Sequence, residues 1–218
     1  MKNHKIIISG MMLIFLITGC SHQLAISNPD DYYSSTPYIN KSISLGVLPP
    51  QSQDAERLVN EIVDNLRGLG NIKVISPYAK SAGNPVDYIL DFNIQTKYSG
   101  DGMNFLISFP GFLIFAPWWN GYNYKANLNT KVTFTEYNSN QVVTTQTYDT
   151  QYRCKQSEFD RTWTQGADWL LTYGIASLIG GIVFTNYDND ITSDFVRSFS
   201  QPYGSYIARK VGTLLNSL

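Results

Sequence analysis

The spacing of apolar and polar residues predicts the secondary structure of the first half of the chain. Residues 43–48, which a Pro-Pro pair follows, have the composition of a short strand. Over 55–69 the apolar residues recur at intervals of three and four, which predicts an amphipathic helix with one buried face. Two further strands are expected at 72–75 and 86–94, so this half reads strand, helix, strand, strand.

The predicted helix also has residues suited to its ends. Ser52 or Asp54 can cap its start, and Gly68 and Gly70 can end it. Its predicted buried face comprises Ala55, Leu58, Val59, Ile62, Val63, Leu66 and Leu69.

A β-hairpin is predicted in the second half of the chain. Apolar and polar residues alternate over 126–134, and strand-forming residues return over 142–148. The residues between them, Tyr-Asn-Ser-Asn at 137–140, are typical of a turn. Hairpin strands of this kind add an antiparallel pair to the predicted sheet.

The last part of the chain, 155–218, has a helical pattern. One helix is expected to start near Thr192 or Ser193. Pro202 is expected to open another, because proline is tolerated in the first turn of a helix but not in its interior.

Together these elements predict an α/β (α+β) fold. A mixed sheet of about five strands, in the order β-α-β-β-loop-β-β, is packed by one N-terminal amphipathic helix and by C-terminal helices. We expect residues 42–218 to form this single domain. The polar, aperiodic residues 20–41 before it are predicted to be a flexible tether.

The first 19 residues have the features of a secretory leader. Two lysines precede an apolar run that is too short for a mature transmembrane helix, and small residues follow. Ile17, Thr18, Gly19 and Cys20 resemble the lipobox of bacterial lipoproteins, in which the cysteine becomes the first mature residue and carries lipid such as palmitate. The alternative is an ordinary signal peptide, 1–19, that ends near a cysteine.

Charge and composition exclude some classes of protein. Without the two leader lysines the 16 basic residues become 14 against 17 acidic ones, and the net charge of −1 becomes −3. No basic field is present, so nucleic acid is not an expected partner. Tyr and Phe number 15 and 11 while only 15% of residues are charged, which is typical of β-rich extracytoplasmic proteins and not of disordered ones.

The sequence lacks a recognisable catalytic set. Its histidines are His4, inside the leader, and His22, two residues from the expected lipid, so histidine-dependent catalysis and the usual zinc sites are not expected. The chain has two cysteines, so once Cys20 carries lipid, Cys154 has no disulfide partner within the chain. We interpret Cys154 as a buried or half-buried residue rather than a nucleophile. Asp87 and Asp91 lie on one face of a predicted strand, as glycosidase carboxylates would, but nothing else points to sugar cleavage.

An oxygen-rich run before the expected helix start gives no metal site either. Residues 188–194 lack the glycine and the distal glutamate of an EF-hand loop, so helix capping by Asp190 or Thr192 is the simpler interpretation. We therefore expect no enzyme activity, no metal and no cofactor.

An uncharged segment at 102–124 is the most site-like feature. Its two prolines interrupt any helix, so it is expected to be a long aromatic loop. The loop either packs on its own domain as a lid over a second uncharged stretch at 169–187, or contacts a neighbouring subunit, or enters lipid. The residues expected to make a partner or membrane contact are Phe109, Phe112, Phe115, Trp118 and Trp119. Residues 169–187 are interpreted as a buried helix, with membrane insertion as the alternative.

Four segments resemble a known family. They are 44–49, 70–75, 85–91 and 136–143, which read Ser-Leu-Gly-Val-Leu-Pro, Gly-Asn-Ile-Lys-Val-Ile, Pro-Val-Asp-Tyr-Ile-Leu-Asp and Glu-Tyr-Asn-Ser-Asn-Gln-Val-Val. In this order behind a lipobox they are similar to the TolB N-terminal-like (anticodon-binding-like) domain, over about residues 43–152. This group includes the curli secretion channel CsgG, the LpoB activators of peptidoglycan synthases and the ring protein PelC. The resemblance implies protein–protein roles in the periplasm, often as rings, without catalytic residues.

The sequence thus predicts a lipid-anchored, non-enzymatic lipoprotein that acts as an accessory or assembly component of the bacterial envelope. Its expected partners are the membrane, through lipid on Cys20, and envelope proteins, with a homo-oligomer as one candidate. Because Ser21 is not the aspartate associated with inner-membrane retention, the expected location is the outer membrane, facing the periplasm. A ring- or pore-forming secretion subunit similar to CsgG and an enzyme acting on envelope polysaccharide are the alternatives.

Overall fold

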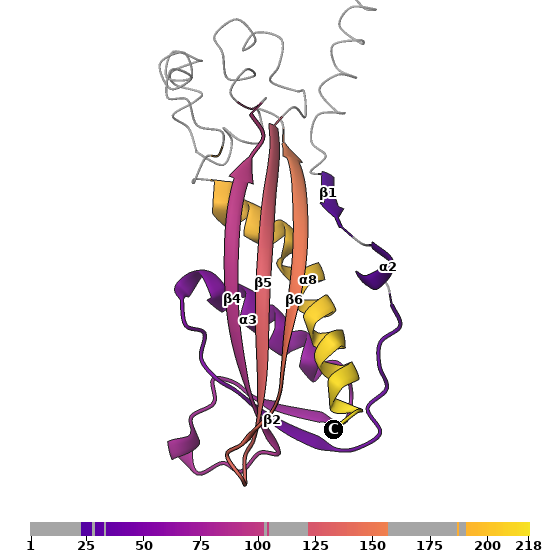
Figure 1. Ribbon diagram of the computed structural model, residues 1–218, viewed down its shortest axis with the longest axis vertical. Coiled ribbons are helices and arrows are strands. Elements are labelled where there is room, and N and C mark those ends of the chain that lie inside the picture. The colour runs from indigo at the N-terminus through magenta and orange to yellow at the C-terminus, as the bar shows by residue number, and fades with distance from the viewer. Residues whose placement is uncertain are drawn as a thin grey trace, which may run out of the picture. The chain divides into compact units, whose positions relative to one another are not determined.

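We analysed a computed structural model of the 218-residue chain. The structure describes residues 23–27, 29–32, 34–102, 104, 122–156, 187 and 191–218. They form a six-stranded mixed sheet with helices packed on it, which confirms the predicted fold class (Figure 1). The strands are β1 (Gln23–Ile26), β2 (Ile43–Val47), β3 (Ile72–Ile75), β4 (Tyr88–Gly100), β5 (Tyr122–Glu136) and β6 (Val142–Gln156). The helices are α2 (Pro29–Tyr32), α3 (Gln53–Arg67) and α8 (Thr192–Leu215), with a 3-10 turn at Lys80–Ala82.

The chain divides into two compact units. One unit comprises 1–26, 98–126 and 152–196, and the other comprises 27–97, 127–151 and 197–218. Strands β4, β5 and β6 and helix α8 contribute residues to both units. The single domain expected over 42–218 stays a prediction.

The strand order is β1-β6-β5-β4-β2-β3. β2 pairs in parallel with both β3 and β4, and α3 provides the long crossover that a parallel β2–β3 pair requires. The Asp87 carboxylate joins the starts of β2 and β4, because its Oδ2 accepts bonds from the Ser44 amide at 2.6 Å and the Ser44 hydroxyl at 2.7 Å. The order predicted from the sequence is therefore confirmed, with β1 as an added strand.

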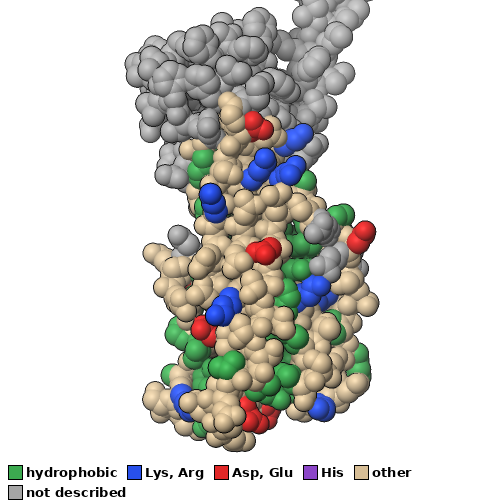
Figure 2. Space-filling model, in the orientation of Figure 1, with side chains coloured by type: hydrophobic (Ala, Val, Ile, Leu, Met, Phe, Trp, Pro, Cys, Tyr) green, Lys and Arg blue, Asp and Glu red, His purple; other side chains and the backbone are tan. Residues whose placement is uncertain are grey.

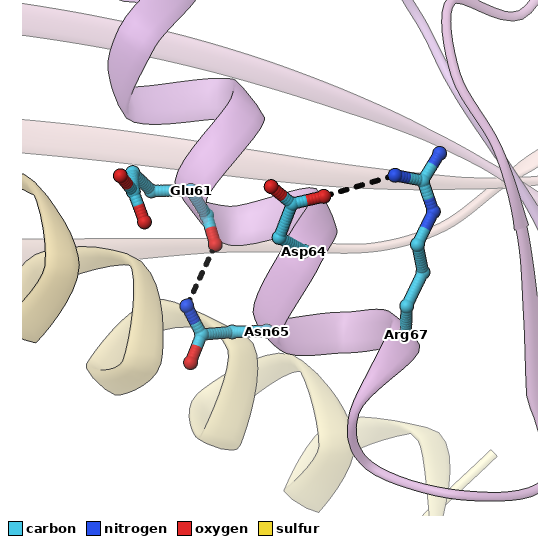
Figure 3. Close-up of polar contacts among 4 residues, drawn as sticks. All are labelled: Glu61, Asp64, Asn65 and Arg67. Atoms are coloured by element: carbon cyan, nitrogen blue, oxygen red, sulfur yellow. Dashed lines mark hydrogen bonds and ion pairs between the residues drawn. The ribbon is translucent and has the colours of Figure 1, made fainter.

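Helix α3 forms where the apolar spacing predicted it. Ser52 caps its start, accepting a bond from the Ala55 amide at 3.3 Å. Its exposed side carries the Asp64–Arg67 ion pair at 2.9 Å, and the Asn65 side chain donates back to the Glu61 carbonyl at 2.8 Å (Figure 3). The predicted apolar face is buried except for Leu69, which is half-buried, so one side of α3 faces the sheet.

Helix α8 corrects the prediction of two C-terminal helices. It runs unbroken from Thr192 to Leu215, with Pro202 inside it. Apolar residues on both sides of the proline are buried on one face, among them Phe199, Tyr203 and Ile207. Continuous burial of this face offsets the local cost of an interior proline, which the sequence pattern alone does not reveal.

Helices α3 and α8 lie on the same side of the sheet and meet at a glycine (Figures 1 and 3). A Cβ atom placed on Gly204 would lie 2.7 Å from the carbonyl carbon of Glu61, so the backbones approach too closely for any side chain there. The Tyr203 hydroxyl beside this contact bonds the Thr130 hydroxyl of β5 at 2.8 Å, and both residues are fully buried. The inner face of the sheet is thus held by α8 through packing and one buried polar pair.

The flexible tether predicted over 20–41 is wrong for the described residues of that range. β1 pairs antiparallel with Tyr152–Lys155 of β6. The ring of Tyr32, in α2, stacks on Tyr206 with 4.3 Å between centroids, and Ile39 is buried. Partners far along the chain supply the pairing and burial that this polar segment does not encode locally.

We predict that Gly204→Ala destabilises the protein by about 1–3 kcal/mol, because α8 must move away from α3 to make room for the methyl group. Thermal or urea unfolding measures the change. Thr213→Ala, at an exposed position of the same helix, is the control and should leave the free energy of unfolding within about 0.5 kcal/mol of wild type. Equal stability of the Gly204→Ala and wild-type proteins would contradict the close approach.

Burial raises the pKa of the Tyr203 phenol well above its ordinary value of 10.0. The hydrogen bond with Thr130 lowers this pKa by a smaller amount, and the nearby Tyr32 raises it slightly. The unfolded chain therefore loses this proton near pH 10 while the folded one keeps it, so stability from this group is present below pH 10 and falls as the pH rises beyond it. We predict that Tyr203→Phe costs about 1–3 kcal/mol at neutral pH, because the Thr130 hydroxyl loses its buried partner. The variant should also lose stability less steeply than wild type above pH 10, which urea unfolding at pH 8 to 11 measures. If the free energies of unfolding of wild type and Tyr203→Phe fell equally steeply above pH 10, the Tyr203 phenol would titrate in the folded protein much as it does in the unfolded one, which would contradict its burial.

Candidate interaction surface

The residues that the sequence singled out for anchoring and contact lie outside the described residues. Ile17, Thr18, Gly19 and Cys20 precede β1, and Phe109, Phe112, Phe115, Trp118 and Trp119 lie between β4 and β5. Of the second uncharged stretch, 169–187, the structure describes only Tyr187, whose ring stacks on Tyr98. The lipidation and contact roles of these segments stay predictions.

The other sequence candidates have structural surroundings. Cys154 is buried, as interpreted from the sequence, and its thiol donates to the Lys155 carbonyl at 3.8 Å. Asp87 is engaged by Ser44, which gives it a structural task between β2 and β4. Among the described residues, no group of three or more His, Cys, Asp and Glu side chains is arranged to hold a metal ion. None of the helices in the described part of the chain is both long and apolar enough to cross a membrane.

The most accessible feature with binding chemistry is one edge of the sheet, formed by residues 142–150 of β6. On one side β6 pairs with β5. On its other side β1 pairs only with Tyr152–Lys155, and the Ser27 amide donates to the Gln151 carbonyl at 3.2 Å. Within the described part of the chain no strand continues this pairing over 142–150. We call these nine residues the β6 edge.

The backbone of the β6 edge has a defined direction. Amide and carbonyl groups alternate sides along a strand, and the Gln151 carbonyl points toward Ser27, away from β5. The backbone groups of the neighbouring alternate residue, Asp149, reach the same side, whereas the Gln141 carbonyl accepts a bond from the Glu136 amide and points toward β5, so the alternation is interrupted between 141 and 149. Side chains fit this alternation, since Thr150 is buried on the helix side while Asp149 and Gln151 bond to β5 on the opposite face.

The β6 edge lacks the features that usually protect sheet edges. Its sequence, Val-Val-Thr-Thr-Gln-Thr-Tyr-Asp-Thr, contains no lysine and no proline, and its one charge is Asp149. Val142 and Val143 are 61% and 44% exposed, among the few large apolar side chains so exposed in the described chain. Long, uncharged edges rich in β-branched residues pair readily with another strand. The composition thus favours strand addition at this edge.

Polar side chains on the outer face hold β6 firmly to β5. The Asn129 side chain donates to Asp149 at 2.7 Å, and Gln151 donates to the Asn127 side-chain oxygen at 2.6 Å. These residues line an open depression of about 630 Å3, whose lining also includes Lys97. Figure 2 shows both basic and acidic side chains on one face of the molecule. The side chains of Asn127, Asn129, Asp149 and Gln151 in this depression thus bond across β5 and β6, and Ser27 donates to the Gln151 side-chain oxygen at 3.2 Å.

On the inner face the β6 edge is flanked by rings from α8. Tyr148 contacts Tyr206 edge-on, with 6.4 Å between centroids, and Lys210 Nζ lies 5.2 Å from the centre of the Tyr206 ring. Partial burial raises the pKa of the Tyr148 phenol. A strand added to the edge would meet this half-buried ring on its inner side, which supplies apolar contact besides backbone hydrogen bonds.

The turn that precedes the β6 edge has the expected chemistry. Asn140 has a φ of 55°, its amide donates to the Glu136 carbonyl at 2.9 Å, and the Glu136 amide donates to the Gln141 carbonyl at 2.9 Å. Four residues, 137–140, connect the two strands, and the last of them, Asn140, has the left-handed conformation. The amino-acid pattern predicts the hairpin but not the β6 edge. Only the order of strands shows on which side of β6 the described residues provide no paired strand over 142–150.

Comparisons with known proteins add little to this description. No protein-family model matches the chain, and neither does any curated protein. Similar solved structures include a PelC dodecamer from Paraburkholderia phytofirmans, with 10% identity, a TM-score of 0.34, and 86% of this chain and 98% of that chain covered. A neuraminyllactose-binding hemagglutinin homolog from Helicobacter pylori has 9% identity, a TM-score of 0.38 and coverage of 83% and 89%. The rare lipoprotein B from Shewanella oneidensis has 13% identity, a TM-score of 0.28 and coverage of 71% and 94%. At such low identities and TM-scores these likenesses carry no argument, and the TolB-like resemblance stays a prediction.

The alternation of backbone groups along β6 predicts a pattern of amide hydrogen exchange. The amide of Asp149 should exchange at least about tenfold faster than those of Tyr148 and Thr150, which face β5. The measurement is NMR-detected exchange at low protein concentration, where the edge is unoccupied. Uniform protection over 148–150 under these conditions would mean that another part of the chain covers the edge.

Proposed function

We propose that this protein is a lipid-anchored component of the bacterial envelope that acts by binding other proteins through the β6 edge, without catalysis. The single observation that carries the binding role is the strand edge at 142–150, which has one charged residue and no neighbouring strand on one side among the described residues. A leader with a lipobox-like end supports export and attachment at Cys20. On the sorting rule applied to Ser21, the location is the periplasmic face of the outer membrane.

The position of β1 supports a close attachment to the membrane. Only Ser21 and His22 separate Cys20 from Gln23, the first residue of β1. Two or three extended residues span about 10 Å at most. A lipid on Cys20 would therefore hold the edge of the sheet at which β1 pairs with β6 near the bilayer, and not at the end of a 20-residue tether.

A binding role agrees with the chemistry of the described residues. Asp87 and Asp149 are engaged in structural bonds, and Glu56 and Asp64 lie on the exposed face of α3. General acid–base catalysis needs a group with a matched partner near a reacting atom, and we identify no such pair. Strand addition requires only an accessible edge with backbone donors and acceptors.

Lipid attachment is tested by mass spectrometry and membrane fractionation of the expressed protein. We predict an acylated Cys20 at the mature amino terminus of the wild-type protein, recovered in the outer-membrane fraction. Cys20→Ala should leave the protein unprocessed or release it in soluble form, because the attachment atom is removed. A Cys154→Ala variant is the control and should fractionate as wild type. An unmodified amino terminus on exported wild-type protein would contradict the anchor.

The binding role is tested by a photo-crosslinking amino acid placed at Thr145 in the lipidated protein in cells. We expect protein adducts at this position that disappear when Thr147→Lys is added, because a lysine on the edge opposes strand pairing. The same crosslinker at Asn60, an exposed position of α3, is the control and should not give those adducts. Identical adducts from Thr145 and Asn60, or none from Thr145, would contradict binding through the β6 edge.

A further inference from the structure

We propose that Lys125, Arg153 and Lys155 form a docking surface for the headgroups of anionic phospholipids, in the leaflet that holds the lipid on Cys20. We call these three residues the basic patch. The inference rests on the proposed function for the anchor, and it adds a second contact with the membrane that the folded chain makes through charge.

The basic patch lies on the outer face of the sheet. Burial alternates over 122–134 of β5 and 150–155 of β6, and in both strands the even-numbered residues are the buried ones. Because successive side chains of a strand point to opposite faces, the odd-numbered Lys125, Arg153 and Lys155 point away from the core. Arg153 and Lys155 are exposed, and Lys125 is half-buried.

The pairing of β5 with β6 brings two cations of the basic patch together. Two side-chain bonds on the outer face show which residues lie opposite each other: Asn129 with Asp149, and Asn127 with Gln151. One further step of two residues along both strands places Lys125 opposite Arg153. Opposite residues of an antiparallel pair have Cβ atoms about 5 Å apart, and like charges there are unfavourable. An anion that contacts both side chains would remove this cost.

The anchor lies close to the basic patch. β1 pairs with β6 so that Gln23 is opposite Lys155. The chain from Cys20 to Gln23 spans about 10 Å at most, and neighbouring strands lie about 5 Å apart. The backbone of Lys155 is therefore within about 15 Å of the residue that would carry the lipid. Lipid on Cys20 would bring the basic patch to the headgroup region.

The described residues around the basic patch leave it positively charged. β1 contains no charged residue. Among the described residues of the same compact unit, the acidic ones are Asp101, directly after β4, and Asp194, in the first turn of α8. Strand β5 separates β4 from β6, and Phe195 of α8 contacts Tyr98 on the inner side of the sheet. Figure 2 shows basic side chains gathered toward the upper end of the described face.

These charges suit a lipid surface better than an acidic protein. A leaflet with anionic lipids attracts each nearby Lys or Arg through its surface potential, so three cations on a flat sheet face need no pocket of matching shape. The anchor also keeps the basic patch at that surface, so a contact too weak to bind a protein from solution is still populated. Each cation should raise the ratio of docked to undocked protein about fivefold.

A spin label beside the basic patch tests the contact in the full, lipidated protein. Ser99→Cys places a nitroxide on β4, next to the inward-facing Tyr98, in a chain whose Cys20 is acylated and whose Cys154 is buried. The protein is reconstituted in phosphatidylcholine vesicles with or without phosphatidylglycerol, and a Ni2+-chelating lipid reports how close the label lies to the headgroups. We expect the label to lie closer when phosphatidylglycerol is present and to withdraw at high salt. The same label at Ser193→Cys, on exposed α8, is the control and should not approach.

Charge-matched variants separate the basic patch from the net charge of the protein. Lys125→Gln combined with Arg153→Gln should lower the ratio of docked to undocked protein at least about tenfold. Lys73→Gln combined with Lys131→Gln removes the same charge at other exposed positions and should change the ratio less than about twofold. The first double variant should unfold at the wild-type midpoint or above it, because two like charges are removed from opposite positions. A native midpoint excludes misfolding as the cause of lost docking.

Each outcome decides the inference. Approach of the Ser99 label that requires both phosphatidylglycerol and the charges of the basic patch supports it. Equal label positions with and without phosphatidylglycerol overturn it, and so does an equal loss in both double variants. If phosphatidylglycerol has no effect while a photo-crosslinker at Lys125 captures an acidic protein, the basic patch binds protein and the lipid inference is wrong.

The same measurements distinguish this inference from the proposed function. If the Ser99 label does not respond to phosphatidylglycerol while the Thr145 crosslinker captures an envelope protein, the basic patch is wrong and the proposed function stands. If wild-type Cys20 proves unacylated, the exported protein is added to the same vesicles. Binding that requires phosphatidylglycerol and is lost in the Lys125→Gln and Arg153→Gln double variant would then leave the basic patch standing and the anchor wrong, and absence of binding would overturn both.

Discussion

The close approach of α8 to α3 is the contact on which the arrangement of the second unit depends. It is possible because Gly204 has no side chain where α8 passes the backbone of Glu61. Two helices that meet so closely can both cover the inner face of the sheet, and their buried faces share one apolar core with β2, β4 and β5. The Thr130–Tyr203 bond fixes α8 against β5 at the centre of this contact. Both helices thereby cover the same face of the sheet.

The uncovered edge follows from the way in which β1 is used. Sheets commonly protect an edge with charge, proline, bulges or a covering element. Here β1 protects only the end of β6, over Tyr152–Lys155, and then the chain leaves the sheet after Ser27 to pack Tyr32 on α8. The remaining nine residues of β6 keep a composition that would suit the interior of a sheet. A strand with interior character at an edge is what binding by strand addition requires.

The anchor and the edge are linked through the same element. Cys20 lies three positions before β1, and β1 pairs with the strand that carries the edge. In the proposed function, lipid on Cys20 confines the protein to one membrane surface, which raises its effective concentration toward partners on that surface. Side-chain bonds from Asn129 to Asp149 and from Gln151 to Asn127 join this end of the edge to β5.

Local patterns determined much of this protein. The apolar spacing over 55–69 defined α3, the alternation over 126–148 defined the hairpin, and the order of elements gave the α+β class, because these features depend on residues close in sequence. The leader and the lipobox-like residues up to Cys20 were likewise legible without a structure. Pro202 was misread as a helix start, since the burial on both sides that keeps α8 continuous comes from β5 and α3. Residues 23–41 were misread as a tether, since Tyr152–Lys155 and Tyr206 provide their contacts from more than a hundred residues away. The β6 edge is the clearest case, because its sequence is that of an ordinary strand, and only the order of strands in the folded sheet decides that none of the described strands pairs with one of its sides.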